Sequence, residues 1–420
     1  MIKRKKFAGT QGALPVIAEI QEVEGDAFLN NIVKTVTGYG FHQILPPPTE
    51  DRRTFAKHPE LAKRFGQRMI DAGGQASAET VLAPTQIFNI FKKYLQNVKR
   101  RGPHVTKWFY ISPVMFLKDN KPVTEHEVGL FVLGEDTALS NSHLINALVE
   151  ILRELEIPDF MIELNSLGCK NCQKEFAEVL AEHLAKNSFD LCADCKADLA
   201  AHPLYVLSCQ NGNCHEQLSG APQIVDFLDE SCKTALMGIL ENIDSLSIPY
   251  MLNPILAERL LTEKIQFRIS SAERPGESLG HGGSYTLWSE YVNRDESVPI
   301  IGFVTSFEKL WDVVPQEKRR TGPRVDVSVI PLGQIASRRA MVLHRDLERS
   351  GVACAESMLG MAGVKNQLKE AADRRSEIAL IIGQKEAIED TVILRDMRSG
   401  MQEIFASDRI IEEVKKRLGR

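Results

Sequence analysis

The sequence lacks a long apolar run and an excess of positive charge. No segment approaches the roughly 20 consecutive apolar residues that a membrane-spanning helix needs. The basic residues 1–6 are not followed by an apolar stretch, so they are not a signal peptide. The formal net charge of -5 excludes a general attraction to nucleic acid, so any such contact would depend on local basic patches. We therefore expect a cytoplasmic protein with no membrane contact.

Two basic patches could make such a local contact with nucleic acid. A solvated charged face explains either of them equally well. The patches are residues 99–101 and the tail residues Lys415, Lys416, Arg417 and Arg420.

Short catalytic signatures are also missing. The chain contains no nucleophile elbow, Walker loop, dinucleotide-binding fingerprint or His-Glu-x-x-His motif. The glycine-rich run at residues 280–283 lacks phosphate-loop spacing. A tight turn before a strand explains this run as well as a ligand-facing loop does. The residues alone therefore assign no reaction.

Length and patterning predict an α+β protein of two or three domains. The chain has 420 residues, of which 43% are hydrophobic and 25% charged. Helical segments lie among antiparallel-looking strands as far as about residue 320, and one of these strands is expected at residues 284–291. Beyond residue 320, strands and helices alternate as in a compact α/β unit with a parallel or mixed sheet.

A change of composition interrupts the first of these regions. We expect a core in two parts, residues 1–167 and 248–320, with a cysteine-rich helical insert at residues 168–247 between them. The α/β unit would occupy residues 321–420.

The cysteines are concentrated in the insert, which holds seven of the eight. In a protein without a secretion signal, this clustering favours metal binding over disulfides. Two C-x2-C pairs with nineteen residues between them match a known zinc spacing, and tetrahedral zinc takes four thiolates. The sequence therefore predicts a closed structural zinc site on Cys169, Cys172, Cys192 and Cys195. Alternatives are reduced thiols in a small core, or a different or second site that uses Cys209, Cys214, His215 and Cys232.

Longer segments, taken together, resemble one family over nearly the whole chain. Residues 39–50, 108–116 with 125–134, and 302–310 resemble motifs 1, 2 and 3 of class II synthetases. Residues 163–168 and 253–254 are characteristic of histidyl-tRNA synthetases, and residues 329–333 and 381–383 resemble their anticodon-binding domain. The resemblance implies a homodimer with an antiparallel-sheet class II core that contacts tRNA. The pocket residues that it implies are Glu127, Arg259, Gly282, Gly283 and Tyr285.

Several positions depart from the family pattern where substrate would bind. Leu117 occupies the neighbourhood of the motif 2 arginine that would hold the ATP α-phosphate, and Lys309 replaces the motif 3 arginine. Glu258 stands where a catalytic arginine would, although a shifted alignment would bring Arg259 there. Thr85 replaces a carboxylate that is expected near the substrate amine. Because activation depends on cations that hold the triphosphate, each lost donor costs on the order of 10²–10³ in rate.

These departures predict a synthetase-like protein that is impaired in histidine activation and acts as a tRNA-binding or regulatory paralog. ATP and magnesium would bind only if the protein were active. One alternative is an active, divergent histidine–tRNA ligase. Another is a synthetase-like regulatory subunit of ATP phosphoribosyltransferase, although that family usually lacks the anticodon domain. The tail unit could also be kept for folding or dimer stability alone, since basic residues at a helix end complement its dipole.

Overall fold

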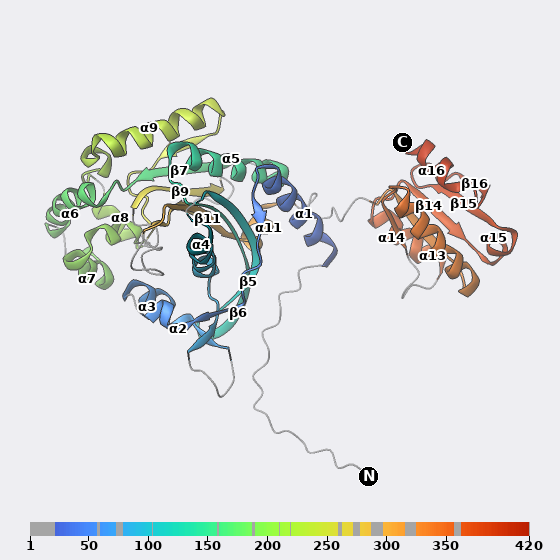
Figure 1. Cartoon of the computed structure of the whole chain (residues 1–420), viewed down its shortest axis with the longest axis horizontal. Helices are drawn as coiled ribbons and strands as arrows, with labels where there is room; N and C mark the ends of the chain where they lie inside the picture. The colour runs from blue at the N-terminus through green and yellow to red at the C-terminus, as the bar shows by residue number, and fades with distance from the viewer. Residues whose placement is uncertain are drawn as a thin grey trace, which may run out of the picture. The chain divides into compact units, whose positions relative to one another are not determined.

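The computed structural model describes residues 22–419, except for 57–58, 73–78, 103, 158, 187–189, 210, 219, 259–262, 272–277, 287–296, 316–324 and 357–362. The chain divides into two compact units (Figure 1). The first unit contains the elements from β1 to α11, and the second contains those from β12 to α16. Among the described residues, no helix is both long enough and apolar enough to cross a membrane.

The first unit is built on an eight-stranded sheet. Its internal neighbours pair antiparallel, whereas each edge strand pairs parallel to its neighbour. In sheet order the strands are β1 (His42–Gln43), β5 (Thr106–Lys118), β6 (Lys121–Leu133), β11 (Ile300–Ser306), β10 (Ser278–Ser284), β9 (Glu263–Ser271), β7 (Phe160–Ser166) and β8 (Tyr250–Leu252). This antiparallel-dominated sheet confirms the predicted α+β fold class of the core.

The β5–β6 hairpin supplies the longest strands of the sheet, with 13 residues each. Asp119 and Asn120 form its turn with φ angles of 51° and 58°, and these residue types tolerate the left-handed region well. Along the ladder, Tyr110 lies opposite Gly129, where an added Cβ would come within 2.4 Å of the tyrosine ring. The glycine therefore leaves room for a buried tyrosine in the middle of the sheet.

Helices and a small sheet cover this ladder (Figure 1). The helices are α1 (Glu22–Gly38), α2 (Arg52–Ala56), α3 (Pro59–Phe65), η1 (Gly66–Arg68), α4 (Ile87–Arg101), α5 (Ala138–Glu154) and α11 (Phe307–Val313). The small sheet has the order β2 (Thr49–Asp51), β4 (Thr80–Leu82) and β3 (Ile70–Asp71). Phe91 of α4 packs edge-on against Phe131 of β6, with ring centroids 5.8 Å apart, so that α4 lies on the sheet through its aromatic face.

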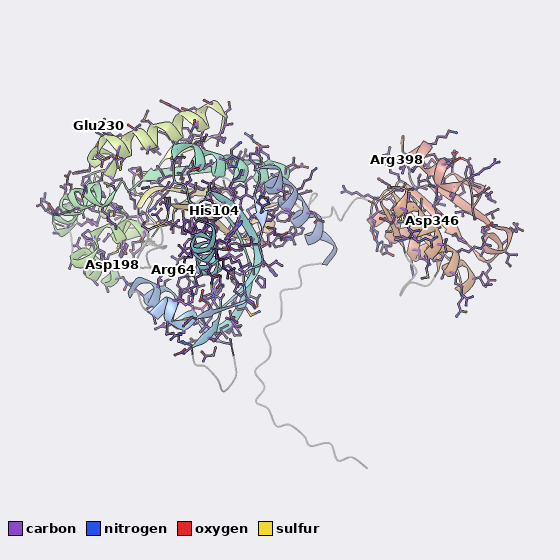
Figure 2. The ribbon with its side chains drawn as sticks, in the orientation of Figure 1. Arg64, His104, Asp198, Glu230, Asp346 and Arg398 are labelled. Atoms are coloured by element: carbon purple, nitrogen blue, oxygen red, sulfur yellow. The ribbon has the colours of Figure 1, made fainter. Side chains whose placement is uncertain are left out.

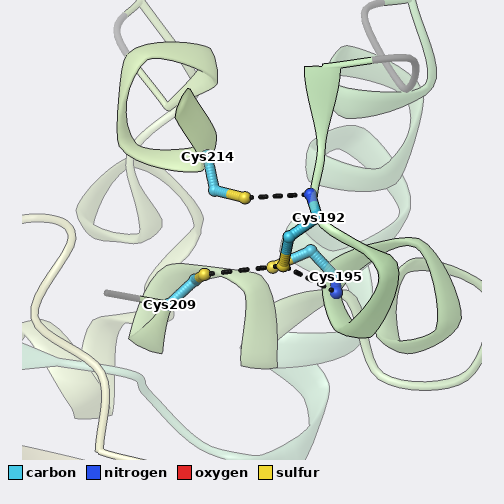
Figure 3. A group of neighbouring side chains, drawn as sticks. All are labelled: Cys192, Cys195, Cys209 and Cys214. Atoms are coloured by element: carbon cyan, nitrogen blue, oxygen red, sulfur yellow. Dashed lines mark hydrogen bonds between the residues drawn. The ribbon is translucent and has the colours of Figure 1, made fainter. Parts of the chain in front are cut away.

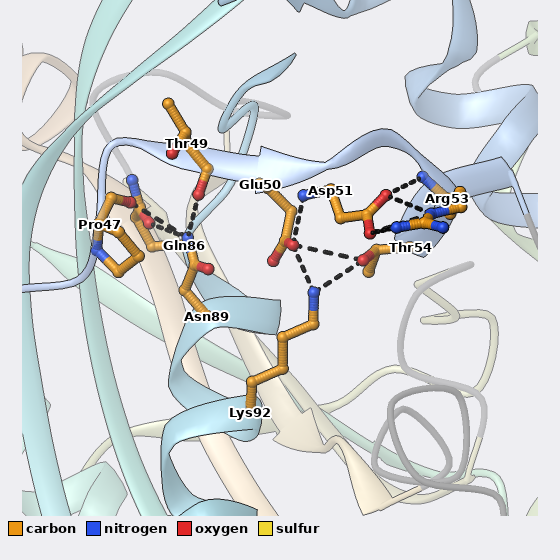
Figure 4. Close-up of polar contacts among 9 residues, drawn as sticks. All are labelled: Pro47, Thr49, Glu50, Asp51, Arg53, Thr54, Gln86, Asn89 and Lys92. Atoms are coloured by element: carbon orange, nitrogen blue, oxygen red, sulfur yellow. Dashed lines mark hydrogen bonds and ion pairs between the residues drawn. The ribbon is translucent and has the colours of Figure 1, made fainter. Parts of the chain in front are cut away.

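A polar network ties the small sheet to α4 (Figure 4). The carboxylate of Glu50 is buried, forms an ion pair with Lys92, and accepts a hydrogen bond from the Asp51 backbone N–H at 2.6 Å. The amide of Asn89 donates to the carbonyl of Pro47 at 3.1 Å. These contacts fix the segment that resembles motif 1 against the helix that leads away from the pocket described below.

The cysteine-rich insert is a set of short helices between β7 and β8. They are α6 (Lys170–Ala185), α7 (Ala193–Ala201), η3 (Pro203–Ser208), α8 (Gly212–Gln217), η4 (Ile224–Phe227) and α9 (Glu230–Ser245). Helix α9 packs against α5 of the core. Asp198 of α7, labelled in Figure 2, lies 3.6 Å from the ammonium of Lys63 of α3. The insert therefore contacts the core at both places.

The second unit is an α/β domain with a mixed five-stranded sheet. Strands β13 (Cys354–Glu356), β12 (Val327–Pro331) and β14 (Ile378–Ile382) run parallel, and β15 (Thr391–Asp396) and β16 (Gln402–Ala406) complete the sheet antiparallel. The helices are α13 (Gln334–Arg349), α14 (Val364–Asp373), α15 (Gln384–Glu389) and α16 (Ile410–Arg417). Strands β12 and β14 are buried along their whole length, as expected for central strands of such a sheet.

The glycine-rich run is neither the turn nor the loop that was expected, because it lies inside β10, although Gly280 and His281 line the pocket described below. A Cβ at Gly282 would come within 2.3 Å of the Phe267 ring, and one at Gly283 within 2.2 Å of the Ile265 carbonyl. The glycines therefore serve close packing between β10 and β9. The strand expected at residues 284–291 is misplaced as well, since β10 ends at Ser284; residues 287–291 lie outside the described residues.

Candidate functional site

A pocket in the first unit lies between the sheet and the short helices α3, η1 and α11. Its wall combines adjacent strands, because the register places Ser306 of β11 opposite Glu127 of β6 and Thr305 opposite Gly280 of β10. The lining residues are Arg64, Phe65, Arg68, Pro84, Thr85, Ile87, Val114, Phe116, Glu125, Glu127, Gly280, His281, Val304, Thr305, Ser306 and Lys309.

Glu127 is a buried carboxylate, 8% exposed, that organises one wall of the pocket. Its Oε1 accepts hydrogen bonds from the Gln86 backbone N–H at 2.7 Å, from the Tyr110 hydroxyl at 2.8 Å and from the Thr85 hydroxyl at 3.1 Å. Burial raises the pKa of Glu127, although these three donors oppose the shift. Burial, together with the charge of Glu127, raises the pKa of Tyr110 well above its usual value, so this phenol stays protonated and donates.

Three cationic side chains line the same pocket as the carboxylates of Glu125 and Glu127. Arg64 at the end of α3 (labelled in Figure 2), Arg68 of η1 and Lys309 of α11 all line it. The guanidinium of Arg68 lies 4.2 Å from the centroid of the Phe116 ring, which is the geometry of a cation–π contact. Burial and the charges of Arg64 and Lys309 lower the pKa of His281, against the opposing effect of Glu258. The arrangement therefore favours a neutral imidazole beside three cationic side chains.

Two local contacts place Lys309 at the pocket. The hydroxyl of Ser306 caps α11 by accepting from the Lys309 backbone N–H at 3.2 Å. The carboxylate of Glu308 accepts from the backbone N–H of His126 at 3.0 Å and lies 2.8 Å from its ring Nδ1. The first turn of α11 is therefore held against β6, and its lysine is directed by the cap.

The structure brings together only some of the positions expected at the site. Thr85, Glu127 and Lys309 line the pocket. Leu117 does not line it, since the strand contributes Val114 and Phe116. This is a consequence of strand geometry, because residues two apart share a face and Leu117 points to the other one.

The other expected positions that the structure describes do not line the pocket. Tyr285 is fully buried in the aromatic cluster with Phe91 and Phe131. Gly282 and Gly283 pack against β9, as described above. The charge of Glu258 acts to raise the pKa of His281. The backbone N–H of Glu258 donates to Oε1 of Gln266 at 2.8 Å. Arg259 lies outside the described residues.

Sequence reasoning missed Arg64, Arg68 and His281 as pocket residues. The two arginines belong to short helical segments without a motif, and His281 lies within the glycine run. Their place in the pocket depends on the packing of α3 and η1 over the sheet. The one usable signal was the spacing of the arginines, four residues apart and hence on one side of a helical segment.

The cysteines form two separate clusters, so the four predicted ligands do not meet at one site. The alternative of a different or second site fits this arrangement through Cys209, Cys214 and Cys232, whereas His215 belongs to neither cluster. The inner cluster is Cys192, Cys195, Cys209 and Cys214, whose sulfur atoms all lie within 4.8 Å of one another (Figure 3). The other predicted pair, Cys169 and Cys172, lies instead with Cys232 and Asp229. The prediction paired the two C-x2-C turns with each other because spacing carries no information on which turns meet in space.

Backbone donors surround the sulfurs of the inner cluster. The N–H of Cys192 donates to the Cys214 sulfur at 3.2 Å, and the N–H of Asn211 donates to the Cys209 sulfur at 3.4 Å. The sulfurs of Cys192 and Cys209 are 3.9 Å apart. Four thiolates at about 2.3 Å from a tetrahedral metal would lie about 3.8 Å from one another. The donor set and its spacing therefore suit a metal ion.

Comparison with known proteins shows which proteins this chain is similar to. A model of the anticodon binding domain matches residues 326–417, which is the second unit. A histidine–tRNA ligase of Halothermothrix orenii is 28% identical over 393 residues, covering 90% of this chain and 92% of that protein. One from Desulfitobacterium hafniense is 26% identical over 415 residues, covering 96% and 95%. The resemblance to histidyl-tRNA synthetases is confirmed.

Solved histidyl-tRNA synthetases share the fold of this chain. The apo enzyme of Staphylococcus aureus superposes with a TM-score of 0.71 at 22% identity, covering 99% of this chain and 100% of that one. A Bacillus halodurans protein described as an ATP phosphoribosyltransferase regulatory subunit/histidyl-tRNA synthetase has a TM-score of 0.59 at 16% identity, covering 91% and 99%. At these identities the likeness shows the fold alone. This chain therefore shares the fold of these solved structures.

Proposed function

We propose that this histidyl-tRNA synthetase-like chain is impaired in histidine activation and acts as a tRNA-binding or regulatory paralog. One observation carries the proposal, the hydrogen bond of 3.1 Å from the Thr85 hydroxyl to Glu127. The family resemblance implies a carboxylate at position 85 to receive the substrate amine. Here the position holds a hydroxyl that is already engaged. The neighbouring carboxylate of Glu127 is in turn occupied by three donors from the protein itself.

The wall that would face the nucleotide supports the same proposal. From β5 it presents an aromatic ring, Phe116, which the guanidinium of Arg68 covers. Loss of one donor to a developing negative charge costs on the order of 10²–10³ in rate. A lysine at position 309 supplies charge but not the planar, bidentate fork of an arginine. This combination supports the proposal of impaired activation.

The cations that remain favour a second candidate, an active but divergent histidine–tRNA ligase. Arg64, Arg68 and Lys309 converge on one pocket, and such a set attracts an anionic ligand. In that case ATP and magnesium would bind here. The third candidate, a regulatory subunit of ATP phosphoribosyltransferase, is disfavoured by the anticodon binding domain at residues 326–417.

The second unit carries the proposed contact with tRNA. Arg338 and Arg339 of α13 line a surface pocket together with Asp346, Asp390 and apolar side chains of β15 and α16. Arg339 forms an ion pair with Asp390, so Arg338 is the cation that we propose to contact an unpaired nucleotide beside the apolar surface. A homodimer is part of the proposal, because the segment resembling motif 1 forms the edge strand β1, followed by Leu45 with 84% exposure. A structural zinc ion at the inner cluster and a cytoplasmic location complete it, since a reducing compartment keeps these thiols free.

The decisive experiment is histidine-dependent ATP–pyrophosphate exchange with the purified chain. We expect exchange at background level. Exchange that depends on histidine and falls at least tenfold in Lys309→Met, but not in the exposed control Lys385→Met, would establish the active ligase instead.

Binding of RNA is measured beside it by electrophoretic shift against total tRNA. We expect a shift that weakens in Arg338→Ala and not in Arg398→Ala, a control in the same unit. If the chain shows neither pyrophosphate exchange nor an electrophoretic shift of tRNA, the tRNA-binding role is refuted. A protein partner would then be the ligand to search for.

A further inference from the structure

A second group of metal-ligating side chains lies at the base of the insert. This outer cluster consists of Cys169, Cys172, Asp229 and Cys232, and one ligand atom from each lies within 4.8 Å of the others. Cys169 stands at the N-cap position of α6, and Asp229 stands at that of α9. The four residues therefore come from the starts of α6 and α9, and Cys169 and Asp229 are 60 positions apart in sequence.

The spacing of the ligand atoms matches a tetrahedral ion. The sulfurs of Cys169 and Cys172 are 3.5 Å apart, and the Cys169 sulfur is 3.3 Å from Oδ2 of Asp229. Around zinc, with bonds of about 2.3 Å to sulfur and about 2.0 Å to oxygen, these edges would be about 3.8 Å and about 3.5 Å. The arrangement therefore needs an expansion of only a few tenths of an ångström to accept the ion.

The two carboxylate oxygens of Asp229 have different surroundings. Oδ1 caps α9, because it accepts from the Cys232 backbone N–H at 2.8 Å and from the Ser231 hydroxyl at 2.8 Å. Oδ2 faces the sulfur of Cys169. The backbone N–H of Asp229 donates to the Cys172 sulfur at 3.2 Å. The capping bonds hold the carboxylate in place, as outer partners of metal ligands do, while one oxygen stays directed at the thiols.

We propose that the outer cluster is a second zinc site, with three thiolate ligands and one carboxylate, distinct from the inner cluster. Its ligands are all protein groups, so the ion would be structural. The inner cluster lies within the loop that the outer one closes. The outer ion would therefore join the start of α6 to the start of α9, whereas the inner ion would hold the short helices between them together.

A cluster of core thiols or a disulfide explains the outer group less well. Cys169 and Cys232 are partly exposed, and Asp229 is exposed, so these side chains are not packed for burial. A disulfide between Cys169 and Cys172 would leave no reason for a capping carboxylate to face one of its sulfurs. A cation accounts for the thiols and the carboxylate together.

Zinc stoichiometry of the whole chain, purified under reducing conditions and measured by native mass spectrometry, tests the proposal. The wild type should carry two ions, Cys232→Ser one, Cys209→Ser one, and the double variant none. The control Cys354→Ser, which changes a cysteine outside the insert, should keep two. A single ion that Cys209→Ser abolishes and Cys232→Ser leaves in place would overturn the proposal, as would a Cys169–Cys172 disulfide in the freshly reduced protein.

Asp229→Ser tests the carboxylate without removing the helix cap, since serine also caps helices. Its outer site should release zinc to a chelator at least tenfold more readily than the wild type. Cobalt substitution gives an independent readout, because a site with three sulfurs and one oxygen absorbs at higher energy than one with four sulfurs. Unchanged chelator resistance and an unchanged cobalt spectrum in Asp229→Ser would remove the carboxylate from the ligand set. These tests do not depend on the proposed function, because they read the metal and not synthetase or RNA-binding activity.

Discussion

Replacement of Glu127 by alanine should destabilise the first unit strongly. The change removes the carboxylate oxygen that accepts from three donors. Two of these donors, the backbone N–H of Gln86 and the hydroxyl of Tyr110, belong to fully buried residues. A hydrogen bond to a charged group contributes about 1.5–3 kcal/mol, but three bonds to one oxygen are not additive. Relief of the buried charge offsets part of the loss. We therefore expect the free energy of unfolding to fall by about 3–5 kcal/mol.

Glutamine at the same position should be nearly neutral, and its effect should depend on pH. The amide oxygen can accept the same donors, so the change in stability should stay within about 1 kcal/mol at neutral pH. Because burial raises the pKa of Glu127, the folded wild type binds its proton more tightly than the unfolded chain does. The wild type therefore gains stability as pH falls through the raised pKa toward the unfolded value, and Glu127→Gln does not. As the pH falls, the free energy of unfolding of Glu127→Gln should therefore decrease relative to that of the wild type.

Tryptophan fluorescence during urea unfolding measures the stability of the first unit. The three tryptophans of the chain, residues 108, 288 and 311, all belong to that unit. The matched control is Glu125→Ala, which removes a carboxylate two residues along the same strand and from the same pocket. It should cost less than about 0.5 kcal/mol, as changes away from buried networks usually do. A cost below about 1 kcal/mol for Glu127→Ala, or an equal cost for Glu125→Ala, would refute the buried-acceptor argument.

Three further outcomes follow from the structure. Gly283→Ala should destabilise the first unit by more than about 3 kcal/mol, because its Cβ would lie 2.2 Å from the Ile265 carbonyl, whereas Gly212→Ala meets nothing within 4 Å and should be tolerated; urea unfolding compares them. Lys92→Met should cost about 2–4 kcal/mol, since it leaves the buried Glu50 without its cation, and Glu50→Gln in the same chain should restore most of the loss in a double-mutant cycle. Removal of zinc by a chelator should lower the unfolding temperature and increase protease cleavage within the insert, both reversed by added zinc.

Secondary structure could be predicted well where the pattern was long and local. The strand at residues 378–382 is uninterrupted in apolar residues and appears with the same bounds, and the hairpin connection followed from Asp119, Asn120 and a nearby proline. The glycine run failed because its glycines serve contacts with Phe267 and the Ile265 carbonyl, which are distant in sequence. Turn and strand use of glycine look alike until the neighbouring strand is known.

The pocket could be predicted only where it follows family motifs. Thr85, Glu127 and Lys309 are placed by segments that resemble those motifs, and they meet at the site. Arg64 and Arg68 reach it through the packing of two short helical segments over the sheet, which no local pattern encodes. For the cysteines, spacing identified two turns that each lie in a cluster of possible metal ligands, but it could not choose which side chains meet. Only the fold brings Cys232 and Asp229 back to Cys169.

The pocket of this chain is better described as changed than as emptied. An emptied site would expose the donors that substrate once satisfied, and buried donors without acceptors are costly. Here Gln86, Tyr110 and Thr85 all donate to Glu127, so that wall is satisfied without a ligand. The pocket is lined by more cationic than anionic side chains. The cations are Arg64, Arg68 and Lys309. A ligand that binds here would therefore enter for its negative charge and not for an amino group, so inorganic pyrophosphate should stabilise the first unit against urea where histidine does not.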